Sequence, residues 1–369
     1  MKHTLLSISI IVSLIGLCSC SGDSLNDETV ATTSIEGATS TTSITETSAT
    51  TQATTTTMEN QTVTIDLTFL GDCTLGTQHG DDTDTSRFNY YALNNSTSYF
   101  LEGAMPYISN DDFTIANCET VFSDNSLQER DKGYTPAFWF KSRTENAKIF
   151  SDNSVEVVSL ANNHTNDFGE QGQLDTQKAI EDTNYTQWGN DDKDVIVEKD
   201  GVKIGIVCCS LWDGNYADNI IDRIEALNDT TDIQVVFFHG GEEAVHSAES
   251  WKIEACHRIV DHGADLIVGG HPHVLQPLET YNGVHIVYSI GNFVFGGNLN
   301  PENATIVYQE EFTYNKSTKQ IVNSTENIVP FYVYGGSGTN NYQPIPVSQD
   351  EYLYSQILGF MYGENSSPI

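Results

Sequence analysis

The chain has 369 residues, 38% of them hydrophobic, which is enough for one large domain or two small ones with a real core. Its 51 acidic and 16 basic residues give a net charge of -35 at pH 7. This balance argues against nucleic-acid binding, which depends on Lys and Arg, and otherwise indicates a solvated acidic surface. An anionic substrate would need a positive group here, and a metal ion would serve.

The first twenty residues are typical of an export signal. Residues 1–3 (MKH) are a short basic start, and residues 5–17 are an apolar stretch too short for an ordinary membrane span. The LCSC at 17–20 resembles a bacterial lipobox, which implies cleavage before Cys20 and a lipid on Cys20. We therefore expect a lipoprotein signal peptide and a protein anchored on the extracytoplasmic face of the cell membrane. The alternative is an ordinary secretory signal and a secreted protein.

Residues 21–60 are dominated by Ser, Thr, Ala, Asp, Glu and Gly, and they contain no aromatic side chain. Such a stretch cannot bury a core. We expect a disordered linker over 21–60, followed by one domain over 61–369.

Apolar runs that predict buried strands recur along the domain, at 63–72, 111–119, 155–164, 202–210, 233–243, 264–273 and 283–293. Helical stretches at 170–183 and 247–263 separate some of them. Strand-like runs at 304–314 and 327–334 would extend the sheets. Strands that alternate with helices predict an α/β layered fold.

Six polar residues share one position in this pattern, because each ends an apolar strand. They are Asp72, Glu119, Asn163, His239, His271 and His273. Ligands bind at that edge of α/β sheets. Oxygen and imidazole ligands suit Mn, Fe, Zn or Mg and do not suit a soft-metal thiolate site. A lone histidine at a strand end is usually only hydrogen-bonded, but the whole set predicts two divalent metal ions that share a bridging carboxylate.

Six motifs between residues 62 and 296 resemble, in order, the bacterial capsule-synthesis CapA family. They are GDCTLG (71–76), NCE (117–119), SLANNHTNDFGEQG (159–172), HGGEE (239–243), GGHPHVLQP (269–277) and YSIGNFVFG (288–296). That family is associated with poly-γ-glutamate synthesis and belongs to the calcineurin-like metallophosphoesterases. The resemblance implies a four-layer α/β/β/α sandwich with a dinuclear site between the sheets.

For the first two motifs, the resemblance implies that Asp72 is the first metal aspartate and that Glu119 takes the place of a bridging aspartate. Typical metallophosphoesterases have Asp-x-His at the first motif, whereas this chain has Asp72-Cys73-Thr74. One imidazole is therefore missing, which weakens the first metal site and puts robust phosphatase activity in doubt.

For the later motifs, the resemblance implies that Asn163 is a metal ligand, that His239 and His271 bind one ion, and that His273 binds the other. Glu242 and Glu243 follow His239 and either support it or open the next helix.

The resemblance implies that His164 is the general acid that protonates a leaving oxygen, a role that suits the pKa range of histidine. Asp167 is expected to orient His164. Lys141, in the aromatic patch at 137–142, is a candidate contact for an anionic substrate, unless the patch is only core aromatics and a solvated lysine. Asn292 is expected near the site.

The cysteines after Cys20 show no CxxC spacing and do not make a disulfide framework. Cys73 and Cys118 each adjoin a predicted ligand, and neighbours on a strand point to opposite faces. We expect them to be small buried residues that point away from the site, with a Cys73–Cys118 disulfide as the alternative.

The first hypothesis is a lipid-anchored, metal-dependent hydrolase that acts on an anionic polymer or a phosphoester in capsule or poly-γ-glutamate production. The alternative is a non-catalytic or weakly catalytic component of a membrane synthesis or export assembly, which the threonine at position 74 favours. Both rest on analogy with the family.

Overall fold

The computed structural model describes residues 61–335 and 338–369, so the predicted signal peptide, Cys20 and the predicted linker lie outside the described residues. The first sheet has eight strands. In spatial order they are β17 (Ile345–Pro346), β16 (Gln320–Tyr332), β15 (Thr305–Asn315), β1 (Thr62–Thr74), β3 (Phe113–Cys118), β6 (Val157–Ser159) and β7 (Gln187–Gly189), while β14 (Asn292–Phe295) also pairs with β1.

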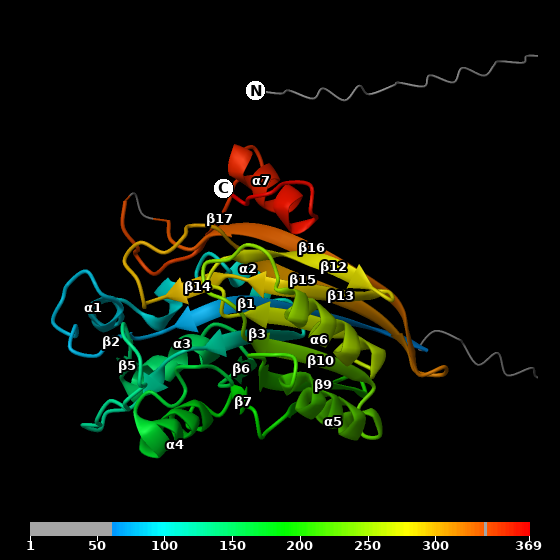
Figure 1. Ribbon diagram of the computed structural model, residues 1–369, viewed down its shortest axis with the longest axis horizontal. Coiled ribbons are helices and arrows are strands. Elements are labelled where there is room, and N and C mark those ends of the chain that lie inside the picture. The colour runs from blue at the N-terminus through cyan, green and yellow to red at the C-terminus, as the bar shows by residue number, and fades with distance from the viewer. Residues whose placement is uncertain (1–60, 336–337) are drawn as a thin grey trace, which may run out of the picture. The chain divides into compact units, whose positions relative to one another are not determined.

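The second sheet has six strands, and Figure 1 shows it together with the first. In order they are β12 (Leu275–Tyr281), β13 (Val284–Ile290), β11 (Leu266–Gly270), β10 (Ile233–His239), β9 (Val202–Ser210) and β8 (Val195–Lys199). A small third sheet consists of β2 (Thr77–Gln78), β5 (Phe140–Ser142) and β4 (Val121–Phe122).

The helices are α1 (Phe88–Asn94), α2 (Met105–Ile108), α3 (Lys148–Ser151), α4 (Gly169–Glu181), α5 (Tyr216–Asn228), α6 (Ser250–Asp261) and α7 (Tyr352–Met361), with short 3-10 turns at Thr97–Phe100 and Thr144–Ala147. None of the helices within the described ranges has the length and apolar character needed to span a membrane.

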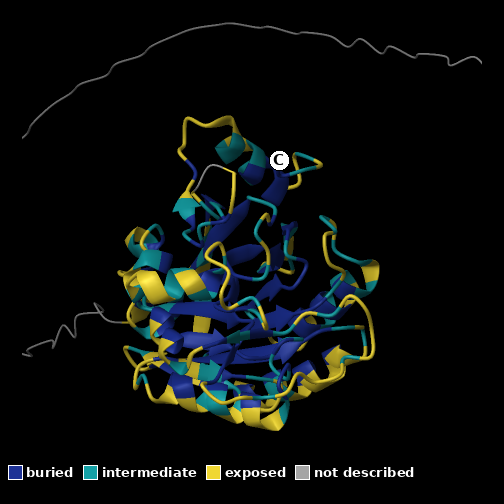
Figure 2. Ribbon diagram, turned by 90° about the vertical axis from the view of Figure 1, so that its left-hand side faces the viewer, coloured by how far each residue is buried: buried dark blue, intermediate teal, exposed yellow. Residues whose placement is uncertain are grey.

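Three apolar clusters show how the layers stack. The first lies between the two large sheets and joins Phe69 of β1 to Ile206 of β9 and Phe237 of β10. The second covers the other face of the eight-stranded sheet with residues of α3 and α4. The third packs α5 and α6 on the outer face of the six-stranded sheet. These interfaces confirm the predicted α/β/β/α sandwich, and Figure 2 shows buried strands inside and exposed faces on the outer helices and loops.

The alternation of side chains along the strands explains why one strand serves two clusters. On β9, Ile206 and Cys208 point between the sheets, whereas Val207 and Cys209 point toward the helices. Strands that are buried on both faces therefore read as continuous apolar runs, which is the pattern at 202–210 and 233–238.

Several strands end earlier than the sequence predicts. Strand β6 covers only Val157–Ser159 of the expected 155–164, and β11 stops at Gly270. The run at 283–293 is divided at Gly291, whose φ of +72° sends the chain from β13 in one sheet to β14 in the other. The polar ends of the predicted strands are thus loops, and loops are where ligand-binding groups concentrate.

Cys73 and Cys118 are buried, free and opposite one another in the β1–β3 register. The two cysteines therefore form no disulfide, and the alternative expectation is wrong. Burial raises the pKa of the Cys118 thiol to about 12, so it stays protonated and acts as a small apolar side chain.

Candidate metal centre

The six predicted ligands meet at one edge of the sandwich, and each large sheet supplies three of them. Asp72, Glu119 and Asn163 come from the ends of β1, β3 and β6, whereas His239, His271 and His273 come from the ends of β10 and β11. The parallel registers align these ends, since β1 and β3 pair up to Cys73 and Cys118, and His239 pairs with Gly270. The oxygen ligands therefore come from one sheet and the imidazoles from the other.

Three of these side chains converge on His239. Its Nε2 lies 2.9 Å from Glu119 Oε1, 2.9 Å from Asn163 Oδ1 and 3.0 Å from Nδ1 of His271. Ligands bound about 2.1 Å from one ion would lie about 3 to 3.5 Å apart. Among the described residues, the buried Glu119 Oε1 accepts no well-formed hydrogen bond. The donor set therefore fits a divalent metal ion.

A second group shares Glu119 and adds Asp72 and His273, with the ligand atoms of the three within 4.8 Å of one another. Asp72 Oδ2 lies 3.1 Å from His273 Nδ1. Thr74, where the missing imidazole would stand, donates its hydroxyl to Glu119 Oε2 at 3.1 Å. Thr74 thus orients the shared carboxylate, and this second group offers one imidazole only.

The loop after β11, which carries His271 and His273, adopts backbone conformations that residues with a Cβ rarely take. His271 has a φ of +93° and His273 a φ of +58°. Such strain persists only where the surroundings impose it, and it concentrates at functional sites. Gly270, the last residue of β11, precedes this loop. No side chain fits at position 270, because a Cβ there would lie 2.6 Å from Asp72 Oδ1.

Charge coupling sets the protonation of these groups. Burial opposes the charged form of Asp72, but the neighbouring imidazoles of His239 and His273 outweigh it and hold the pKa of Asp72 far below its usual range. Burial also opposes charged imidazolium, yet Glu119 and Asp72 raise the pKa of His239 and of His273 to about 9. Burial and the charges of its histidine neighbours lower the pKa of His271 to about 2.

Two further residues, Asn117 and Trp212, contact the candidate ligands. The amide nitrogen of Asn117 donates to Asp72 Oδ1 at 2.8 Å and lies 2.9 Å from His239 Nδ1. The indole ring of Trp212 meets the rings of His271 and His239 edge to face, with centroids 4.9 and 5.7 Å apart. Asn117 lies inside a motif of the resemblance, but no pattern in the sequence indicates its contacts or those of Trp212.

His164 and Asp167, the predicted catalytic pair, are in contact beside the ligands. His164 Nδ1 lies 2.9 Å from Asp167 Oδ2, which also accepts a hydrogen bond from the backbone N–H of Phe140 at 2.8 Å. Lys132, for which no pattern in the sequence predicts a role, pairs with Asp167 Oδ1 at 2.5 Å. The fully buried carboxylate of Asp167 is therefore held from three sides.

A pocket of about 360 Å³ opens next to the ligands. It is lined by His164, His273, Asn292 and Glu243 and by the aromatic rings of Phe138, Phe140 and Phe295. Asn292 Oδ1 lies 3.0 Å from His273 Nδ1, so the structure brings Asn292 to the centre. The pocket has no lysine or arginine among its lining residues, so positive charge for an anionic group there would come from its histidines or from bound metal ions.

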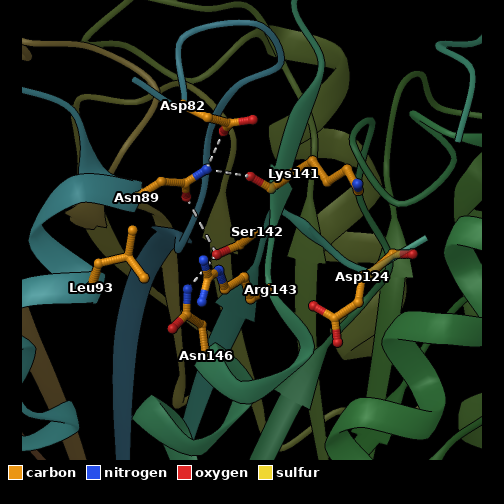
Figure 3. Close-up of a pocket in the computed structure, with 9 residues that line it drawn as sticks. Asp82, Asn89, Leu93, Asp124, Lys141, Ser142, Arg143 and Asn146 are labelled. Carbon is orange, nitrogen blue, oxygen red and sulfur yellow. Dashed lines mark hydrogen bonds between the residues drawn. The ribbon is translucent and has the colours of Figure 1, made fainter. Parts of the chain in front are cut away.

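The structure does not bring Lys141 to this centre, and the expectation that it contacts an anionic substrate stays a prediction. Lys141 follows Phe140 on β5, and neighbours on a strand point to opposite faces. Phe140 lines the pocket at the ligands, whereas the Lys141 ammonium donates to the Asn125 carbonyl at 2.7 Å. Lys141 lines a separate pocket of about 290 Å³ with Asp82, Asn89 and Arg143 (Figure 3).

Comparison with known proteins gives two kinds of match. The sequence model of the family described as bacterial capsule synthesis protein PGA_cap matches residues 66–297. The capsule biosynthesis protein CapA of Bacillus anthracis is 32% identical over 226 residues, 54% of each chain. The PGA biosynthesis protein CapA of Bacillus subtilis is 30% identical over 212 residues, 52% of this chain and 55% of the relative. The matched region spans about half the length of these relatives.

Among solved structures, a phosphatase from Mycoplasma pneumoniae aligns over 73% of this chain and 94% of its own, with 14% identity and a TM-score of 0.43. A 5'-nucleotidase from Candida albicans aligns over 72% of this chain and 51% of its own, with 10% identity and a TM-score of 0.36. Structural similarities this weak support no conclusion about the present chain.

Proposed function

Because this chain belongs to the bacterial capsule synthesis protein PGA_cap family, we propose that it is a metal-dependent hydrolase of capsule or poly-γ-glutamate production. The observation that carries the proposal is the convergence of Glu119, Asn163 and His271 on Nε2 of His239, beside a contact between His164 and Asp167. His273, another of the candidate ligands, lines the same pocket as His164, the candidate proton donor.

The side chains divide into two sets that share Glu119. One ion would be held by Glu119, Asn163, His239 and His271, and the other by Glu119, Asp72 and His273. Divalent ions in such a site supply Lewis acidity, which activates water and neutralises charge on a phosphoryl or carboxyl oxygen. The oxygen and imidazole donors are compatible with Mn, Fe, Zn or Mg.

His164 is proposed to protonate the leaving group. Its Nδ1 faces Asp167, so its Nε2 remains for the substrate, and the ring lines the pocket. Asp167 fixes the ring orientation, while Lys132 and the Phe140 N–H hold Asp167 in place. The substrate would be an anionic polymer or a phosphoester that reaches the pocket beside His273.

We propose further that the protein is lipid-anchored through Cys20 on the extracytoplasmic face of the membrane and acts with a membrane synthesis or export complex. The lipobox-like LCSC at 17–20 supports the anchor, and the matched capsule relatives support the setting. A globomycin-sensitive shift in the mobility of the full chain would support lipidation, and an unchanged mobility after Cys20→Ser would contradict it.

A non-catalytic or weakly catalytic role in such an assembly is the second candidate, because Thr74 replaces an imidazole and uses its hydroxyl on Glu119. A site with one fewer imidazole can still bind metal for structure or recognition.

Metal content by elemental mass spectrometry tests the centre. We expect about two equivalents of metal per chain in the protein after growth and dialysis in metal-replete buffer. The Asn163→Ala, His273→Ala double variant should lose bound metal. A control with the exposed residues changed, Asn323→Ala and His262→Ala, should keep its metal. Absence of metal from the wild-type protein would contradict the hydrolase proposal.

With metal bound, His164→Gln should lower hydrolysis of a phosphodiester or a γ-glutamyl oligomer by about 10²- to 10⁴-fold without loss of metal. Equal rates in the wild type and His164→Gln would favour the assembly role.

A further inference from the structure

The loop between β10 and α6, residues 240–249, carries a carboxylate to the candidate ligands. An oxygen of Glu243 and one nitrogen each of His271 and His273 all lie within 4.8 Å of one another. Glu243 also lines the pocket that contains His164 and Asn292. It therefore lies at the open side of the centre, whereas Asp72 and Glu119 are fully buried.

The backbone around Glu243 is fixed to the histidine loop. The N–H of Ala244 donates to the carbonyl of Pro272 at 2.8 Å, which lies between the two histidines. On either side of Glu242 and Glu243, Gly241 has a φ of +113° and Ala244 a φ of +58°. Alanine rarely adopts a positive φ, so the position of Glu243 is imposed by its surroundings.

The rest of the loop is anchored by a buried polar network. The Lys252 side chain is fully buried, and its ammonium lies 2.8 Å from Glu249 Oε2 and 3.1 Å from Gln276 Oε1. Gln276 in turn donates to the carbonyl of Val245 at 2.7 Å. A buried ammonium is costly unless it is paired, so this network holds the loop in one conformation.

The ligand set of Asp72, Glu119 and His273 lacks the imidazole that the family pattern places at position 74, since Thr74 is engaged with Glu119. Glu243 is grouped with His273 of this set and with His271 of the other. We propose that Glu243 is a metal ligand that completes the set of His273, which is the set short of an imidazole, from the solvent side. The set then has three carboxylates and one imidazole. The other set, which includes His239 and His271, has one carboxylate, one amide oxygen and two imidazoles. An oxygen-rich set prefers a harder ion such as Mn²⁺ or Mg²⁺. The inference rests on the proposed metal centre.

Equilibrium titration of the full, metal-stripped protein with Mn²⁺, followed by electron paramagnetic resonance of the free ion, tests this assignment. We expect the wild type to bind two ions and Glu243→Gln to bind one of them at least about tenfold more weakly. Glu242→Gln is the matched control, because Glu242 is an exposed neighbour in the same loop, and it should bind as the wild type does.

The outcomes separate the two proposals. Two ions bound with unchanged affinity in Glu243→Gln would overturn the assignment and leave the metal centre in place, as would a single ion bound equally by the wild type and the variant. No binding by the wild type would contradict the centre itself. Matching thermal unfolding curves of the metal-free variants exclude misfolding as the cause of a difference.

Discussion

Asn117 contacts two of the predicted metal ligands. It is almost completely buried, and its amide joins Asp72 of one predicted ligand set to His239 of the other. The side-chain oxygen of Asn117 accepts a hydrogen bond from the side chain of Asn162, in the turn that carries Asn163. Partners of this kind fix the orientation of ligand side chains and tune the affinity for metal.

Asn117→Ala should therefore weaken metal binding by about 10- to 100-fold, because Asp72 and His239 lose a common partner. Titration with Mn²⁺ measures the change. Asn153→Ala is the control, since Asn153 is an equally buried amide that bonds the carbonyls of Ile149 and Thr97. Equal affinities in the two variants would show that Asn117 has only a structural role.

The contact between β1 and β14 brings Asp72 and Asn292 together. The two strands pair in parallel with Asp72 opposite Asn292, and the N–H of Asp72 donates to the Gly291 carbonyl at 2.9 Å. This approach requires glycine at position 71, where a Cβ would lie 2.0 Å from the Gly291 oxygen. The glycine that begins the GDCTLG motif thus serves strand packing, and only its neighbour Asp72 is a predicted ligand.

Gly71→Ala should lower the free energy of unfolding by about 3 kcal/mol, because backbone must move to admit the methyl group. It should also separate Asp72 from Asn292 and weaken metal binding. Chemical denaturation measures the first effect. Gly214→Ala is the control and should be close to neutral, because nothing lies within 4 Å of a Cβ there. A stability equal to wild type in Gly71→Ala would contradict the described packing.

The two large sheets are joined by a buried polar contact as well as by the apolar core. His285 on β13 lies 2.9 Å from Glu310 on β15, and Glu310 also accepts hydrogen bonds from Tyr308 and Ser324. The hydrogen bond and charge of Glu310 raise the pKa of His285 in spite of its burial. Protonated His285 therefore stabilises the contact between the sheets.

This contact makes stability depend on pH. Because the pKa of His285 is raised on folding, its contribution is complete below the unfolded value of about 6.5 and is lost as the pH rises through the folded value. His285→Gln should cost about 2 kcal/mol near pH 6 and less near pH 9, measured by denaturation of the metal-free proteins. His262→Gln, at an exposed histidine, should show no such trend. A cost that does not change with pH would contradict the charged pair.

Much of this molecule follows from local patterns in the sequence. Apolar runs locate the buried strands, and the polar residues that end them locate Asp72, Glu119, Asn163 and His239, because parallel strands bring their carboxyl ends to one edge. Helix α5 also had a readable signal, with Ile220, Ile224 and Leu227 at helical spacing, although it was not predicted.

Only the tertiary structure decided which side chains face the centre. Lys141 and Phe140 are neighbours, yet the pleat of β5 sends one away and the other to the pocket. Lys132, Asn117, Trp212 and Glu243 reach the site through turns and through contacts between distant segments, whose geometry no periodic pattern encodes. The strand pattern in the sequence thus determines the edge at which ligands gather, whereas long-range packing determines which neighbours support and complete them.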